Sequence, residues 1–142
     1  HSIGCNTVAH LARMRPELVR RAVFIGPLWT RSKHPRIRIA LRLALDAFRE
    51  PLSLYRYVIP AYWRVGFAHW WQTGMRFAPD VGCERKLPCD SIVVAGVRDP
   101  LPDRSCVAVQ DVAGAHACVF SHPHDITRVL GSPPALSDPP RS

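Results

Sequence analysis

The sequence has few acidic residues, little lysine and no long apolar run. Its 142 residues include 11 Asp and Glu against 19 Lys and Arg, and 17 of those 19 are arginine, which gives a formal net charge of +8. No window approaches the roughly 18 uninterrupted apolar residues that a membrane-spanning helix needs, and the N-terminus has no basic-then-apolar signal arrangement. Together with 47% apolar and 21% charged residues, these absences exclude a fully disordered or collagen-like chain and a membrane span, and they favour a soluble globular protein.

The sequence also lacks paired cysteines and glycine-rich phosphate loops. The five cysteines, at positions 5, 83, 89, 106 and 118, are odd in number and contain no C-x-x-C pair, so they predict neither a disulfide framework nor a zinc site. His122 and His124 flank a proline but do not supply a tetrahedral set of metal ligands. We therefore expect reduced thiols in a cytoplasmic protein, with no metal and no cofactor.

The positive charge is concentrated in one region. Residues 13–50 contain ten basic and three acidic residues, whereas residues 80–142 contain six basic and eight acidic residues. Arginine-rich helical faces are usually solvated surface, and no zinc-finger spacing or RNA-binding aromatic motif accompanies them, so we expect no nucleic-acid partner. One hypothesis is a non-catalytic basic helical module that binds an anionic partner or a lipid surface through residues 13–50.

Alternating helix and strand patterns predict an α/β fold. Residues 3–21 place apolar side chains at helical spacing as far as about Arg15, and a short apolar run closed by Gly26 follows them. Such a run is typical of a buried parallel strand. The pattern predicts three parallel strands, near residues 22–26, 91–96 and 106–112, and a last helix over residues 125–130.

Residues 28–88 contain no strand pattern and predict a helical insertion. Between residues 36 and 50, apolar residues recur every three or four positions. The residues turned away from them are Arg38, Arg42, Asp46 and Arg49. An aromatic stretch follows and predicts two short helices, interrupted at Pro60 and near Gly74.

The segment Ser2-Ile3-Gly4 stands immediately before the first predicted helix. By itself, a serine in this place most often caps the helix N-terminus. A serine that is followed by a helix, a strand and a turn also matches the right half of the G-x-S-x-G turn, which presents the serine hydroxyl at a helix N-terminus. The first glycine of that motif would precede His1.

Two later loops carry the partners that such a serine needs. The second predicted strand leads into Asp99 and the third into His116, which gives the chain order Ser, Asp, His. The carboxyl ends of parallel strands lie at one edge of the sheet, so these side chains can converge there. Asp103 is an alternative acid, and an ordinary turn residue before Pro100 is the alternative interpretation of Asp99.

These patches resemble the C-terminal portion of the serine-type α/β-hydrolase fold family, beginning at its nucleophile elbow. HSIGCNTVAHLARMRPELVRRAVFIGP is similar to the elbow, first helix and next strand, VVAGVRDPLPDR to the acid loop, and VAGAHACVFSHP to the histidine loop. The resemblance implies a partial α/β-hydrolase fold. Its parts are the elbow, helix and strand at 1–27, a helical cap at 28–88, the acid and histidine strands at 89–130, and a disordered tail at 131–142.

The resemblance further implies a serine hydrolase of carboxylesterase or lipase type that acts on a small ester or related acyl bond through an acyl-enzyme. Ser2 would be the nucleophile, His116 the general base and then general acid, Asp99 the carboxylate that orients His116, and the amide of Ile3 an oxyanion donor. An acyltransferase or a carbon–carbon bond hydrolase on the same scaffold stays open, because fold does not determine function.

Within the implied cap, we expect some aromatic residues to face the substrate, although helical core packing explains each of them equally well. These residues are Tyr62, Trp63, Trp70 and Trp71. The sequence also departs from the family's pattern. Cys5 replaces a small residue, and only 16 residues separate Asp99 from His116, too few for the helix that the family has there. A second oxyanion donor and a neighbouring strand would lie upstream of His1, so we expect weak activity from this chain alone and an apolar sheet edge at residues 22–26.

Overall fold

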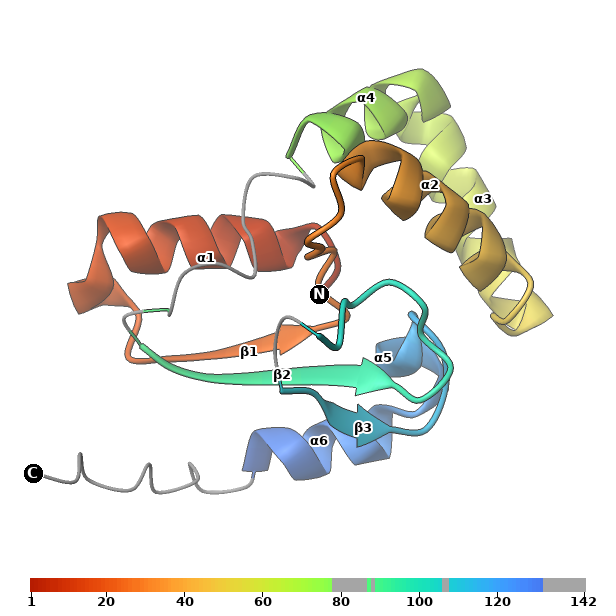
Figure 1. Cartoon of the computed structure of the whole chain (residues 1–142). Coiled ribbons are helices and arrows are strands. Elements are labelled where there is room, and N and C mark those ends of the chain that lie inside the picture. Colours follow the sequence, from red (N-terminus) through yellow and green to blue (C-terminus); the bar gives the residue numbers. More distant parts are fainter. Residues whose placement is uncertain (78–86, 88, 106–107, 132–142) are drawn as a thin grey trace, which may run out of the picture.

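The fold is a small parallel sheet with helices on both faces. The computed structural model describes residues 1–77, 87, 89–105 and 108–131. Its strands are β1 (Arg21–Ile25), β2 (Asp90–Gly96) and β3 (Gln110–Val112), in the order β1-β2-β3 and parallel throughout. Figure 1 shows α1 (Gly4–Met14) on one face of this sheet and α6 (Pro123–Gly131) on the other. The predicted mixed α/β architecture with three parallel strands is confirmed.

The third strand is shorter than predicted. The expected strand over 106–112 was wrong at its start, since Ala108 and Val109 precede β3 and residues 106–107 lie outside the described ones. Only residues 97–109 connect β2 to β3, and they must carry the acid loop and return along β2. β3 pairs with the last three residues of β2 alone, Val94 to Gly96. As the spacing predicted, no helix lies in the described part of this connection.

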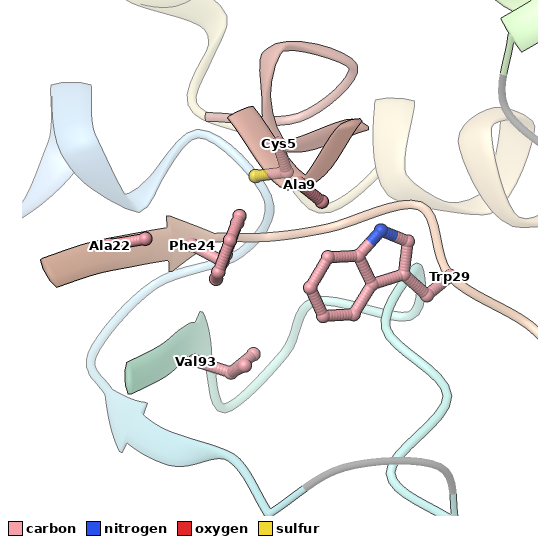
Figure 2. Packing of buried hydrophobic residues seen from close by; sticks show 6 residues of the cluster. All are labelled: Cys5, Ala9, Ala22, Phe24, Trp29 and Val93. Atoms are coloured by element: carbon pink, nitrogen blue, oxygen red, sulfur yellow. The ribbon is translucent and has the colours of Figure 1, made fainter. Parts of the chain in front are cut away.

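Side chains of the sheet alternate between two apolar clusters, as the twofold period of a strand requires. Figure 2 shows the cluster on the α1 face, formed by Cys5, Ala9, Ala22, Phe24, Trp29 and Val93. Its two aromatic rings lie 5.0 Å apart, and the Trp29 indole donates a 3.0 Å hydrogen bond to Asn6 Oδ1, so this buried polar group is satisfied. The cluster on the opposite face comprises Ile25, Val94, Val112, Cys118, Ile126 and Val129.

Three helices group on the side of the molecule where β1 and β2 end (Figure 1). They are α2 (Pro35–Ala47), α3 (Leu52–Val65) and α4 (Phe67–Phe77). The predicted interruptions at Pro60 and Gly74 were wrong, because α3 continues through Pro60 and α4 through Gly74. The break falls at Gly66, whose φ of +84° ends α3 in a conformation that glycine adopts at little cost.

Two shorter segments connect the larger elements. A 3-10 turn, η1 (Pro16–Leu18), follows α1, and a one-turn helix, α5 (Cys118–Ser121), precedes α6. The last predicted helix is confirmed and extends to Gly131, while the rest of the predicted tail, residues 132–142, lies outside the described residues. Among the described residues, no helix is both long and apolar enough to cross a membrane.

Candidate catalytic site

The backbone at Ser2 is held in an uncommon conformation. Its φ of +54° makes it the one non-glycine residue with a positive φ in the described part of the chain. The Ser2 amide donates to the carbonyl of Ile25 at the end of β1 (2.9 Å), and the Gly4 amide donates to the carbonyl of His1 (3.0 Å). Such conformations cost about 1–3 kcal/mol and persist only where the surroundings impose them, often at functional sites. This sharp turn brings the Ser2 hydroxyl to the start of α1.

Ser2, His116 and Asp99 form one continuous chain of hydrogen bonds. His116 Nε2 lies 2.9 Å from Ser2 Oγ, and His116 Nδ1 lies 3.0 Å from Asp99 Oδ2. Because a carboxylate only accepts, Nδ1 carries the proton and Nε2 accepts from the serine hydroxyl. The Asp99 side chain is fully buried, and its other oxygen accepts the Leu101 amide at 2.9 Å. The imidazole is therefore held in the tautomer that can take a proton from Ser2.

The alternative acid, Asp103, is occupied elsewhere. Its carboxylate accepts hydrogen bonds from the hydroxyl and amide of Ser105 and from the hydroxyl of Thr30, and it lies 3.7 Å from the Arg38 guanidinium. The hydrogen bond from Ser105 is the main cause that lowers the pKa of Asp103. Of the two candidate acids, the structure thus brings Asp99 to His116 and uses Asp103 to tie its loop to the segment before α2.

Two residues that the sequence analysis did not single out pack closely against the histidine. A Cβ atom added at Gly26, whose φ is +55°, would lie 2.8 Å from His116 Nδ1 and 3.0 Å from Asp99 Oδ2. The His1 imidazole donates to the carbonyl of His116 at 2.9 Å, and the two rings lie 4.8 Å apart. A glycine that closes an apolar run was visible in the sequence, but nothing local indicated what approaches it.

Two carboxylates reach the histidine loop from α2 and the turn that follows it. Asp46 Oδ1 accepts the His116 amide at 3.2 Å, and Glu50 Oε1 accepts the Ala117 amide at 2.5 Å. Burial is the largest cause that raises the pKa of Asp46, to about 6, while the neighbouring His116 and its amide act in the opposite direction. The prediction that Asp46 faces solvent was wrong, because its exposed fraction is 6%. Helical periodicity alone treats every polar residue as outward-facing and misses one buried against a loop.

The amide of Ile3 is available beside the hydroxyl. Within the described part of the chain it has no hydrogen-bond acceptor, whereas the flanking amides of Ser2 and Gly4 are both satisfied. It belongs to the residue directly before α1, where the aligned peptide dipoles place partial positive charge. This group can therefore stabilise an anion that forms next to Ser2 Oγ.

A cavity of about 700 Å³ opens onto Ser2 and His116, a size in the range of small-ligand sites. Of the predicted aromatic residues, Tyr62, Trp70 and Trp71 line it, and the Tyr62 and Trp70 rings lie 4.4 Å apart. The prediction for Trp63 was wrong, since this side chain is 87% exposed. Consecutive residues of an α-helix are rotated by about 100° about its axis, so Trp63 points away from the cavity when Tyr62 faces it. Apolar side chains dominate the remaining walls, among them Leu28, Leu43, Leu54, Val58, Val119 and Phe120.

Two of the described thiols, those of Cys5 and Cys118, are not alternative nucleophiles. Cys5 and Cys118 are both buried. Burial raises the pKa of both, that of Cys118 to about 11, which keeps these thiols protonated at neutral pH. Within the described ranges no cluster of three or more His, Cys, Asp or Glu side chains could hold a metal ion.

Comparison with known proteins adds a similarity of fold. No described protein family matches the chain, and no curated protein sequence is similar to it. The structure of Rv0554 from Mycobacterium tuberculosis is similar over 91% of this chain and 61% of that one, with a TM-score of 0.56 and 15% identity. The crystal structure of BpoC, a candidate non-heme bromoperoxidase from Mycobacterium tuberculosis H37Rv, aligns over 91% of this chain and 62% of that one, with a TM-score of 0.49 and 14% identity. The chain spans less than two thirds of either structure, and at these identities the likeness concerns the fold alone.

Proposed function

We propose that the chain carries the active site of a serine hydrolase that cleaves a small ester or related acyl bond through an acyl-enzyme. The observation that carries this proposal is the unbroken contact from Ser2 Oγ through His116 to the buried Asp99 carboxylate. A serine hydroxyl is a weak nucleophile until a neighbouring base takes its proton. The positive φ of Ser2 supports the same conclusion, because a helix cap alone does not need this strained backbone.

The proposed reaction has two halves. In the first, His116 Nε2 takes the hydroxyl proton as Ser2 Oγ attacks the ester carbonyl, and the resulting imidazolium then gives that proton to the leaving alcohol oxygen. In the second half, His116 takes a proton from water, whose oxygen attacks the acyl carbon. His116 then returns this proton to Ser2 Oγ as the carboxylic acid leaves. Asp99 stabilises the imidazolium in both halves without taking the proton itself.

Charge on the carbonyl oxygen requires donors in each half of the reaction. The unpartnered amide of Ile3 is the donor that this chain supplies, helped by the N-terminus of α1. Loss of one such donor typically costs about 10²- to 10³-fold in rate.

We propose that helices α2 to α4 form a cap over the site. The apolar cavity walls favour a substrate whose acyl or alcohol group is apolar and lies under this cap. Apolar and aromatic side chains from all three helices line the cavity. The same relay would serve an acyltransferase if an alcohol replaced water in the second half. Release of free carboxylic acid in water without an added alcohol would therefore distinguish a hydrolase from an acyltransferase.

The alternative of a basic binding module is less well supported. Several arginines of residues 13–50 are engaged within the molecule. Arg42 donates to the carbonyl of Leu101, Arg49 donates to the carbonyl of Arg98, and Arg38 pairs with Asp103. These contacts lower the number of cations that are available to an anionic partner.

A fluorophosphonate probe tests the proposal, because it reacts covalently with an activated serine. We expect wild-type chain to be labelled on Ser2, and Ser2→Ala to take no label. His116→Ala and Asp99→Asn should lower the labelling rate at least about 10²-fold, as loss of triad members does in serine hydrolases.

Ser121 provides the matched control. Its Oγ lies 2.9 Å from the ring of His122, so it is a serine with a histidine neighbour but without the Asp99 contact. Ser121→Ala should be labelled like the wild type. Equal labelling of the wild type and Ser2→Ala would overturn the proposed function.

A further inference from the structure

Helix α2 and its C-terminal turn contact both loops that carry the site. On the acid loop, Arg42 Nη1 donates to the carbonyl of Leu101 and Arg49 Nη1 to the carbonyl of Arg98, each at 2.8 Å. These two carbonyls belong to residues on either side of Asp99. On the histidine loop, the carboxylates of Asp46 and Glu50 accept the amides of His116 and Ala117, as described above.

Arg42 and Asp46 are four residues apart on α2, so their side chains lie on the same side of the helix. Arg49 and Glu50 follow in the turn after Ala47, where the amides of both residues bond to the Asp46 carbonyl. We call these four residues the α2 clamp.

The clamp matches the polarity of the groups that it meets. Its two cations meet carbonyl oxygens, and its two carboxylates meet amide N–H groups, so all four contacts are charge-assisted hydrogen bonds, which are stronger than neutral ones. Asp46 is buried in making its contact. Burial of a carboxylate is costly unless hydrogen bonds compensate it. An arrangement of this kind fixes the two loops relative to one another through a third, rigid element.

We propose that the α2 clamp positions Asp99 and His116 for proton transfer by holding their two loops at one separation. This inference rests on the proposed function, since it assigns positioning residues to the same site. All four residues hydrogen-bond to loop backbone, and Asp46 and Glu50 also line the cavity. We assign them a positioning role through His116 and Asp99. A further consequence is that displacement of α2 would disturb the His116 to Asp99 contact.

Paired substitutions at the carboxylates test the clamp. Asp46→Leu and Glu50→Leu keep much of the side-chain volume but remove the acceptor, whereas Asp46→Asn and Glu50→Gln keep a carbonyl oxygen that can accept the same amide. We expect the leucine variants to lower the rate of Ser2 labelling by about 10- to 100-fold, because small misplacement of catalytic groups has effects of this size. The amide variants should recover the rate to within about threefold of the wild type.

The cationic half of the clamp has a control on the same helix. Arg49 is exposed, so Arg49→Ala should fold and still lower the labelling rate. Arg36 is also exposed on α2, and within the described part of the chain its side chain makes no hydrogen bond or ion pair, so Arg36→Ala should label like the wild type. Arg49→Ala and Glu50→Leu labelling as fast as Arg36→Ala would overturn the clamp. Arg49→Ala also carries the test if a leucine variant fails to fold.

Proton NMR separates the clamp from the proposed function. The Nδ1 proton shared by His116 and Asp99 should give a far-downfield resonance that weakens in Arg49→Ala and Asp46→Leu and stays in Arg36→Ala. If wild type takes no label and the resonance still responds in this way, the hydrolase proposal fails and the clamp stands. If the wild type is labelled, but the resonance and the labelling rate are unchanged in the clamp variants, the clamp proposal is wrong and the hydrolase proposal is retained.

Discussion

At the scale of single residues, Gly26 shows how little room surrounds the His116 side chain. Its φ of +55° and the 2.8 Å approach of His116 Nδ1 leave no place for a side chain. We predict that Gly26→Ala lowers the rate of Ser2 labelling by at least about tenfold. The added methyl group must displace His116 or Asp99 from their contact, and misplaced catalytic groups react much more slowly.

Gly131→Ala is the control for this prediction, because a Cβ at Gly131 meets nothing within 4 Å. Its labelling rate should equal that of the wild type. A Gly26→Ala variant that folds and is labelled at the rate of Gly131→Ala would contradict the packing described for the site.

The same scale shows which site residues could be predicted from sequence. The sequence could predict Ser2, Asp99 and His116, because each stands at a boundary between predicted elements. Their order along the chain is also the Ser, Asp, His order of a known hydrolase motif. Asp46 was not, because its partner is 70 residues away and its helical position resembles a solvated one. Trp63 was misassigned because composition indicates an aromatic helix but not which of its neighbouring side chains faces the cavity.

At the scale of elements, the docking of α2 predicts a pH dependence of stability. The pKa of Asp46 is raised by burial from 3.8 to about 6, so between these values the folded chain binds more protons at this residue than the unfolded chain. This contribution favours folding at low pH and is lost as pH rises to about 6. Asparagine does not ionise, so Asp46→Asn does not lose stability at this position as pH rises. We predict that the stability of Asp46→Asn relative to wild type increases by on the order of 2 kcal/mol between pH 4 and pH 7.5.

Urea unfolding followed by tryptophan fluorescence measures this difference at each pH. Glu17→Gln is the control, because Glu17 is an exposed acid that pairs with Arg15 far from the site. Its stability relative to wild type should change little over the same range. A constant difference between Asp46→Asn and wild type at both pH values would contradict the burial of a protonatable Asp46.

Element boundaries were predictable where a local pattern determined them. Apolar runs closed by glycine placed β1 and β2 to within one residue. The start of β3 depended instead on which residues pair with β2, which is a property of the sheet and not of the apolar run itself. Likewise α3 continues through Pro60, because one lost backbone hydrogen bond did not outweigh the rest of that helix.

At the scale of the whole molecule, the candidate site depends on long-range assembly. The Ser2 turn, the end of β1, the α2 clamp, and the acid and histidine loops are far apart in sequence and meet at the edge where β1 and β2 end (Figure 1). Part of the net charge of +8, which in the sequence suggested an anionic partner, is used in this assembly through Arg42 and Arg49. β1 lies at the edge of the described sheet.

Detection of a covalent acyl adduct on Ser2 is the sharpest test of the proposed hydrolase. The chain would be incubated with an activated ester whose acyl group deacylates slowly, digested with trypsin, and the peptide spanning residues 1–13 analysed by fragmentation mass spectrometry. We expect an acyl group on Ser2 in the wild type and none on this peptide in Ser2→Ala. An adduct that persists on the peptide in Ser2→Ala, or a wild-type peptide without an adduct, would contradict it.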